Sequence, residues 1–243
     1  MNRLNFRLGC KIIPNLVVTF FKALLNFIYP PYCVLCKTQR LEEKEIICET
    51  CWERLSLFRL GSEINVAGLH FSEGEPLFEE AVAVWGYEEE IQQIIHLFKY
   101  QRHPSLARRL GQEMGKAVLE KTPYANADLL MPVPLHSSRY RERGYNQSWL
   151  LCREISKVTG IPVEHKALVR IRATKSQALL PAKERLENVQ DAFRVKQQEA
   201  VRGRVIILVD DVLTTGSTLN ACARELKLAG ADKVLVLTAA RAR

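Results

Sequence analysis

A run of apolar residues that leads into two acids and a hydroxyl-rich loop constrains this chain more than any other feature. Residues 205–209 are unbroken and mostly β-branched, which is typical of a strand buried on both faces of a parallel sheet. Asp210 and Asp211 follow where that strand is expected to end, and a helical pattern begins at Leu219. We therefore predict an α/β domain with a parallel sheet flanked by helices, in which this segment forms a strand, a loop and a helix N-terminus.

The loop after the two acids is suited to bind a phosphate group. Free N–H groups and the positive end of the helix dipole point into it, and Gly216 lets a ligand approach the backbone closely. Its hydroxyl donors are Thr214, Thr215, Ser217 and Thr218. Asp210 and Asp211 would repel a phosphate, so we expect them to bind ribose hydroxyls, either directly or through Mg²⁺. Together these preferences predict a sugar-phosphate ligand.

The order of these features separates the loop from other phosphate-binding motifs. The sequence contains neither Gly-x-x-x-x-Gly-Lys-Ser/Thr nor Gly-x-Gly-x-x-Gly. Two acids followed by a Thr-Thr-Gly loop resemble instead the motif that binds phosphoribosyl pyrophosphate (PRPP) in type I phosphoribosyltransferases. The alternative interpretation is an ordinary strand-to-helix turn in which Ser217 or Thr218 caps the helix.

Arginines are concentrated after a second predicted strand, residues 128–134, which is ended by prolines. Arg139, Arg141 and Arg143 occupy alternate positions there. We expect them to form a strand-end loop whose guanidinium groups bind phosphate or pyrophosphate oxygens. His136 precedes them, and a lone histidine in such a place is more often a satisfied loop residue than a catalyst.

Residues 168–194 contain few apolar residues between two predicted strands. We expect this segment to close over the site as a mobile flap, with Arg170 or Lys175 acting on the transition state if a transfer reaction takes place. A surface hairpin without a role in the site is the alternative.

Four of the seven cysteines form two Cys-x-x-Cys pairs, Cys33 with Cys36 and Cys48 with Cys51. Two pairs so close in sequence predict a structural Zn²⁺ site with four thiolate ligands. Because the segment is small and charged, metal binding would supply much of its folding free energy. Free or redox-active thiols are the alternative. The other cysteines are scattered, which is typical of a cytoplasmic protein.

The sequence divides into four predicted regions. They are an amphipathic helical leader at 1–29, a four-cysteine zinc module at 30–60, a linker at 61–80 and the main domain at 81–243. The leader's apolar run is broken by Pro14 and polar residues, so we expect neither an export signal nor a membrane span. Peripheral contact with the inner face of a membrane is the minority alternative.

Within the main domain, periodicity predicts further elements. We expect a strand at 81–87, helices at 89–100 and 106–119, and a last strand at 234–237 that closes the sheet.

The chain is basic, with 35 Lys and Arg against 27 Asp and Glu and a formal net charge of +8. Such a charge favours polyanionic partners. Cations and aromatic rings alternate in residues 139–145 and again in residues 99–102, and this mixture is typical of single-stranded DNA binding. Because the same arginines are expected to hold pyrophosphate, we predict that PRPP and DNA compete.

With these motifs in order, the chain resembles the ComF (ComFC) family of competence-associated, phosphoribosyltransferase-like proteins. The resemblance covers about residues 30–243, and Tyr145 stands where the family is expected to have Phe. It rests on the paired Cys-x-x-Cys start, on Pro132-Val133-Pro134-Leu135-His136 running into Arg143-Gly144-Tyr145-Asn146-Gln147, on Arg170-x-Arg172-x-Thr174-x-x-Gln177, and on Val209-Asp210-Asp211-Val212-x-Thr214-Thr215-Gly216-Ser217-Thr218.

The resemblance implies a type I phosphoribosyltransferase fold behind a small zinc module. It also implies a role in natural transformation, with single-stranded DNA and a helicase-like ATPase of the uptake machinery as partners. The alternatives are an active phosphoribosyltransferase acting on a nucleobase or related acceptor, and a structural adaptor with a vestigial pocket. The residues identify no base pocket, so the sequence leaves these functions open.

Overall fold

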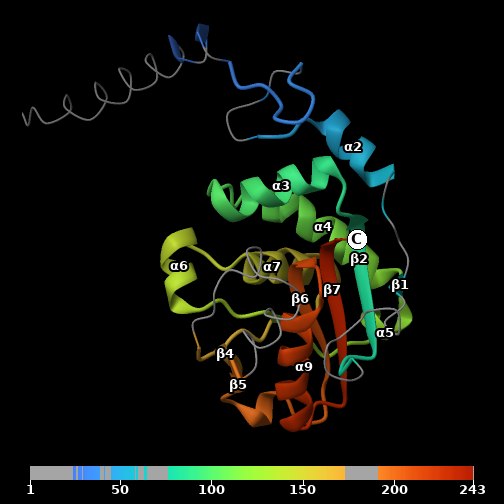
Figure 1. Cartoon of the computed structure of the whole chain (residues 1–243). Coiled ribbons are helices and arrows are strands. Elements are labelled where there is room, and N and C mark those ends of the chain that lie inside the picture. The colour runs from blue at the N-terminus through green and yellow to red at the C-terminus, as the bar shows by residue number, and fades with distance from the viewer. Residues whose placement is uncertain are drawn as a thin grey trace, which may run out of the picture. The chain divides into compact units, whose positions relative to one another are not determined.

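The computed structural model describes residues 24–25, 27–28, 30–38, 41, 45–57, 59, 63–64, 76–172 and 191–242 (Figure 1). The chain forms two compact units, Met1–Arg54 and Leu55–Arg243. Most of the expected leader, and the flap residue Lys175, lie outside the described residues. Among the helices that are described, none has the length and apolar character needed to cross a bilayer.

The first unit holds the cysteine pairs. Cys33 and Cys36 lie in one turn, and Cys48 and Cys51 lie at the start of helix α2 (Glu49–Leu57). The backbone joins the two parts, because Val34 N donates to Ile46 O at 3.0 Å and Leu41 N donates to Pro31 O at 2.8 Å. Its described buried apolar side chains other than cysteine are Leu41, Ile47 and Trp52. So small a core agrees with a fold that depends on metal.

The second unit is built on a five-stranded sheet with the order β1-β2-β7-β6-β3. The strands are β1 (Glu63–Ile64), β2 (Glu80–Gly86), β3 (Leu129–Pro132), β6 (Val205–Leu213) and β7 (Lys233–Arg241). The pairs β2–β7, β7–β6 and β6–β3 are parallel, and β1 is antiparallel to β2. The carboxyl ends of the parallel strands therefore meet at one edge of the sheet, where α/β proteins bind ligands.

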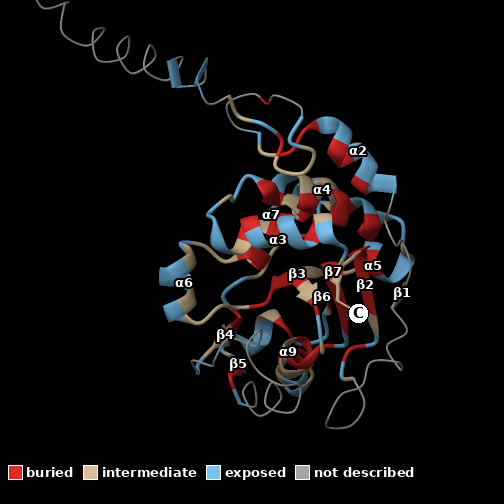
Figure 2. Ribbon diagram, turned by 45° about the horizontal axis from the view of Figure 1, so that its top comes forward, coloured by how far each residue is buried: buried red, intermediate tan, exposed pale blue. Residues whose placement is uncertain are grey.

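Helices cover both faces of this sheet (Figure 2). Helices α4 (Leu106–Leu119) and α7 (Gln147–Thr159) pack on each other, α7 also packs on β3 and β6, and α9 (Ser217–Leu228) covers the opposite face. Glycine permits the close α4–α7 contact, since a Cβ at Gly115 would lie 2.7 Å from Val158 Cβ. The other described helices are α3 (Glu89–Tyr100), α5 (Thr122–Ala125), α6 (Ser137–Arg143) and the 3₁₀ turn η3 (Gln198–Ala200).

The parallel α/β class predicted from the sequence is confirmed, and helices α3 and α4 have the predicted bounds. Two strand predictions need correction. Strand β6 continues through both acids to Leu213, because its last residues still pair with Ala240 and Arg241 of β7. Strand β7 is a nine-residue central strand rather than a short closing one, since burial continues along it to Ala240.

The division of the chain also differs from the expected one. The compact units separate between Arg54 and Leu55, whereas the sequence suggested residue 60 as the end of the zinc module. Strand β1 lies inside the segment expected to be a linker and pairs with β2. Part of that segment therefore belongs to the sheet.

The predicted flap segment is described only at its base. Strands β4 (Leu168–Arg170) and β5 (Phe193–Val195) pair antiparallel there, and Arg170 lies opposite Phe193. The Arg170 guanidinium carbon lies 5.1 Å from the centroid of the Phe193 ring. Arg170 is therefore held at the rim of the main sheet by its own strand pair.

Candidate functional site

A cavity of about 240 Å³ lies at the carboxyl ends of β3 and β6; we call it the sheet-edge cavity. Its lining combines residues from α3, α6, α7, β4, β6 and the loop into α9. They include Lys99, Arg139, Arg143, Gln147, Ser148, Arg170, Asp210, Asp211, Thr214 and Thr218. Motifs that are far apart in the sequence therefore converge on one space.

The two acids are each held by a neighbouring side chain. Asp211 is buried, and its Oδ1 lies 2.7 Å from the Lys99 Nζ. Asp210 Oδ1 accepts from Ser148 Oγ at 2.9 Å and from the backbone N–H of Asp211 at 2.9 Å. Helices α3 and α7 thus fix the orientation of the carboxylates.

Burial and neighbouring charges set the pKa values of Asp210 and Lys99. Burial, and then the charge of Asp211, raises the pKa of Asp210 to about 6. Burial on its own would lower the pKa of Lys99, but the adjacent Asp211 carboxylate outweighs it and raises that pKa above its ordinary value. Lys99 is therefore a permanent cation beside the acids, while Asp210 gains and loses a proton close to neutral pH.

The hydroxyl loop leads into helix α9 as predicted. Gly216 is its N-cap and adopts a left-handed backbone conformation with φ of 75°, which glycine adopts without steric cost. A small hollow of about 30 Å³ lies at this helix end, lined by Asp210, Thr214, Gly216, Ser217 and Thr218 among others. Thr215 lines neither this hollow nor the sheet-edge cavity, and its Oγ1 lies 2.9 Å from Ser217 Oγ. Four of the five predicted loop residues therefore face a space at the start of the helix.

The arginine segment is a helix rather than the predicted loop. In α6, residues four apart share a face and residues two apart do not. Arg139 and Arg143 accordingly line the sheet-edge cavity, whereas Arg141 lines a different pocket. Burial and then the nearby charge of Arg143 lower the pKa of Arg139, a repulsion that a bound anion would relieve. The prediction that all three arginines share one anion site therefore needs correction.

His136 is a structural residue, in line with the prediction. It forms the N-cap of α6, and its Nδ1 accepts from the backbone N–H of Ser138 at 3.3 Å. The α6 segment is further tied to α3, because Tyr145 Oη donates to Phe98 O and Arg102 Nη2 donates to Glu142 O at 3.2 Å.

Three cavity residues were not recognised from the sequence as parts of the acid and anion sites. Lys99 was expected only as part of the mixture of cations and rings at residues 99–102, while Ser148 and Gln147 were not assigned. Gln147 is 1% exposed, its Oε1 accepts from Arg143 Nη1 at 3.0 Å, and its Nε2 has no hydrogen-bond partner within the described residues. The position of Gln147 directly after the arginine motif was the one available signal.

A second pocket, of about 630 Å³, lies on the other side of α6; we call it the aromatic pocket. Its lining includes Tyr140, Arg141, Tyr145, Trp149, His165 and Arg170. The Trp149 ring centroid lies 6.1 Å from that of His165, and also 4.9 Å from the guanidinium carbon of Arg153. Rings and cations thus surround this space.

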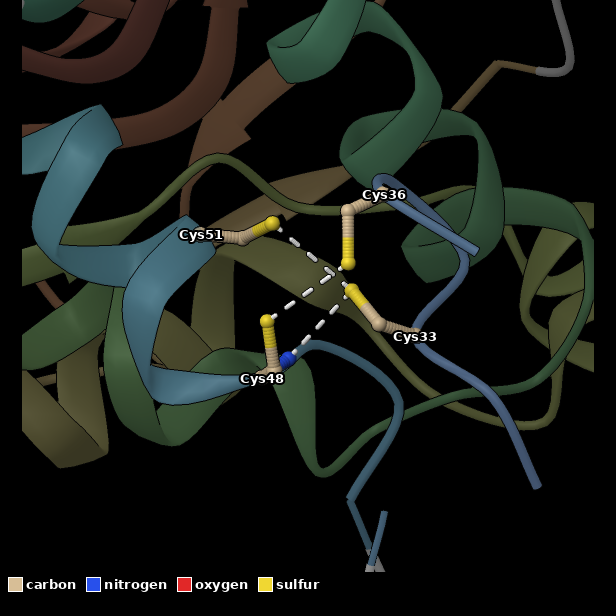
Figure 3. Close-up of side chains that lie close together, drawn as sticks. All are labelled: Cys33, Cys36, Cys48 and Cys51. Atoms are coloured by element: carbon tan, nitrogen blue, oxygen red, sulfur yellow. Dashed lines mark hydrogen bonds between the residues drawn. The ribbon is translucent and has the colours of Figure 1, made fainter. Parts of the chain in front are cut away.

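The four predicted zinc ligands point toward one another in the first unit (Figure 3). All four Sγ atoms lie within 4.8 Å of each other, with Cys33–Cys51 at 3.8 Å and Cys36–Cys48 at 3.9 Å. Sulfurs bound at about 2.3 Å to a tetrahedral Zn²⁺ are about 3.8 Å apart, so the cluster fits a structural zinc ion. Within the described residues it is the only cluster of metal-ligating side chains of this kind.

Comparison with known families identifies both parts of the chain. The phosphoribosyl transferase domain family matches residues 155–243, and the double zinc ribbon domain family matches residues 24–75. The chain therefore belongs to the class of proteins that combine a phosphoribosyltransferase-type α/β fold with an N-terminal zinc ribbon. Among solved structures, the glutamine PRPP amidotransferase of B. subtilis superposes with a TM-score of 0.40 at 21% identity, over 59% of this chain and 30% of that one.

Two related proteins identify the family of this chain within that class. Competence protein F of Haemophilus influenzae is 31% identical over 225 residues, which covers 86% of this chain and 96% of that protein. The DNA utilization protein YhgH of Escherichia coli K12 is 35% identical over 164 residues, 66% of this chain and 71% of that protein. The chain belongs to the ComF family of competence-associated proteins.

Proposed function

We propose that this protein supports the uptake and use of single-stranded DNA and binds a sugar phosphate of the PRPP class in the sheet-edge cavity. Membership of the ComF family supports the first part. The observation that carries the second part is that the acid pair, the helix N-terminus at Gly216 and two arginines all border one cavity and the hollow beside it.

Each part of a PRPP molecule has a chemically suitable partner. The N–H groups at the start of α9 and the hydroxyls of Thr214, Ser217 and Thr218 would hold the 5′-phosphate, as helix N-termini do. Asp210 and Asp211 would accept hydrogen bonds from the ribose hydroxyls. Arg139 and Arg143, with Gln147 Nε2 as a further donor, would hold the diphosphate.

Mg²⁺ was expected to accompany PRPP, and the fit of the acid pair to Mg²⁺ is poor. Lys99 already holds Asp211 Oδ1, and two N–H or O–H donors already hold Asp210 Oδ1. An ammonium group 2.7 Å from a carboxylate oxygen repels a divalent ion that approaches the same oxygen. We therefore assign no role to a metal on these carboxylates.

The lining of the aromatic pocket supports the proposal that the protein binds single-stranded DNA directly. Tyr140 is 53% exposed beside Arg141, and Trp149 and His165 offer further ring faces. Single strands bind through such rings, which stack on bases, together with cations that contact phosphates. A helicase-like ATPase of the uptake machinery is the protein partner that we propose on the cytoplasmic side.

Isothermal titration calorimetry with PRPP and with ribose 5-phosphate tests the sugar-phosphate site. We expect saturable binding to the wild-type protein and its loss in the Asp210→Asn/Asp211→Asn double variant. Asp232→Asn, an exposed aspartate between α9 and β7, is the matched control and should bind normally. Absence of heat with both ligands at millimolar concentration would refute the site. Release of pyrophosphate with a panel of nucleobases would show transfer in addition to binding.

A further inference from the structure

Lys99 places a cation directly beside the acid pair. It extends from the last turn of α3, and its Nζ is 2.7 Å from Asp211 Oδ1. The Lys99 side chain is 20% exposed and the Asp211 side chain 9%, so water screens this pair weakly. It is therefore a largely enclosed ion pair at the wall of a ligand cavity.

The charges around the pair disfavour a second cation. Arg143 and Arg139 line the same cavity, and Arg143 is close enough to Lys99 to oppose its charge. Asp210 Oδ1 already accepts from Ser148 Oγ and from the Asp211 N–H. A divalent ion that bound Asp211 Oδ1 would therefore have to displace Lys99.

Lys99 leaves part of the acid pair available to a ligand. It contacts one oxygen of Asp211, and Ser148 and the Asp211 N–H contact one oxygen of Asp210. These contacts leave the second oxygen of each carboxylate able to accept a further hydrogen bond. Vicinal hydroxyls of a ribose are donors for two such oxygens, and the ammonium group can donate to a ribose oxygen as well.

We propose that Lys99 is a specificity-determining residue that takes the place of a divalent metal at the acid pair, so that the ribose of the ligand is bound without Mg²⁺. This inference rests on the proposed sugar-phosphate site. Lys99 positions Asp211 and balances its charge, and the selectivity is for a ribose phosphate that arrives free of metal.

Ribose 5-phosphate is the sharpest probe, because it lacks the diphosphate that would itself carry Mg²⁺ into the cavity. Calorimetry in EDTA and in millimolar Mg²⁺ should give the same dissociation constant for the wild-type protein. Lys99→Met should lose about tenfold or more in affinity in EDTA, because it leaves a buried carboxylate unpaired, and should recover part of that affinity in Mg²⁺. Lys99→Arg keeps the charge and should remain independent of Mg²⁺.

The matched control is Lys116→Met, which removes a lysine that pairs with Glu113 Oε1 at 2.6 Å outside the cavity. It should bind ribose 5-phosphate as the wild type does in both buffers. Thermal unfolding of each variant separates loss of folding from loss of binding.

Binding of Mn²⁺ to the ligand-free protein, followed by electron paramagnetic resonance, gives a second readout. The wild type should show no Mn²⁺ site at the acids, and Lys99→Met should gain one that Asp211→Asn then removes. Binding that requires Mg²⁺ in the wild type, an Asp211-dependent Mn²⁺ site in the wild type, or unchanged affinity of Lys99→Met in EDTA would each overturn the role of Lys99. Absence of ribose 5-phosphate binding in every buffer would overturn the proposed site and the inference with it.

Discussion

Arg139 and Arg143 lie one helical turn apart on α6, and both line the sheet-edge cavity. Arg143 is held in place by two neighbours, because its Nη1 donates to Gln147 and its guanidinium carbon lies 5.2 Å from the centroid of the Tyr100 ring. A preformed guanidinium loses little freedom when it binds an anion. The pair is therefore well placed to bind an anion at one wall of the cavity.

Arg143→Ala should weaken PRPP binding, whereas Arg141→Ala should not. A charge-assisted hydrogen bond contributes about 1.5–3 kcal/mol, which corresponds to roughly a tenfold to hundredfold loss of affinity. Arg141 is the matched control, since it lies on the same helix and carries the same charge but lines the aromatic pocket. Calorimetry with PRPP measures both. Equal losses in the two variants would contradict the division of α6 into two faces.

Gly216→Ala should lower both stability and affinity for the sugar phosphate. A side chain at φ of 75° costs about 1–2 kcal/mol, and any adjustment of the backbone moves the N–H groups at the start of α9. Gly203 also has a positive φ, 69°, but lines neither cavity, so Gly203→Ala is the control for strain alone. It should lose comparable stability in urea unfolding and no affinity in calorimetry.

Asp210 makes the stability of the protein depend on pH. Its pKa of about 6, raised chiefly by burial, means that the folded state holds the proton more tightly than the unfolded chain does. That contribution is complete below the ordinary aspartate pKa and is lost as pH rises through about 6. A raise of about two pKa units corresponds to at most about 3 kcal/mol.

Asp210→Asn should therefore unfold at a higher temperature than the wild type at pH 8, with the difference shrinking toward pH 5. Asparagine Oδ1 can still accept from Ser148 Oγ, so the packing is retained. Scanning calorimetry across this range measures the effect. A variant that is less stable than the wild type at pH 8 would show that Lys99 and the ligand-free cavity favour the charged carboxylate instead.

The cysteine cluster should bind about one Zn²⁺ per chain by elemental analysis. The Cys33→Ser/Cys48→Ser variant should lose it and unfold the first unit, because the described core there is small and metal binding supplies folding free energy. Amide hydrogen exchange should meanwhile show β6 and β7 protected as before. Cys10→Ser, outside both pairs, is the control, and full zinc content in the double variant would place the ion on other ligands.

Contiguous patterns predicted the parts of the molecule that depend on neighbouring residues. The apolar run at 205–209 forms the first part of β6, with residues 206–209 fully buried, and the two cysteine pairs meet as expected. Residue chemistry likewise predicted that Gly216 would lie at a helix N-terminus. These features follow from local periodicity and from geometry that a few residues impose.

Contacts between distant segments were beyond prediction. Lys99, on helix α3, reaches Asp211 on strand β6, and nothing in the spacing around Lys99 distinguishes it from a solvated lysine. The alternation of Arg139, Arg141 and Arg143 was interpreted with the period of an extended loop, whereas the segment folds with helical period. The extended period predicted that all three arginines would share one site, whereas the structure places Arg141 in a different pocket from Arg139 and Arg143. We therefore no longer expect PRPP and DNA to compete for Arg141.

The last prediction concerns single-stranded DNA and depends on that separation. Each phosphate contact on a single strand contributes about −0.7 to the slope of log affinity against log salt. Arg141→Ala should flatten the slope by about that amount for all sequences alike. Trp149→Ala should weaken binding by about 1–3 kcal/mol through lost stacking, without changing the slope.

Saturating ribose 5-phosphate should leave the Arg141-dependent part of the slope unchanged, because Arg141 does not line the sheet-edge cavity. Fluorescence anisotropy of a labelled oligonucleotide over a salt series measures all three effects. A slope that is the same in Arg141→Ala as in the wild type would exclude the aromatic pocket as the DNA site and leave DNA handling to protein partners.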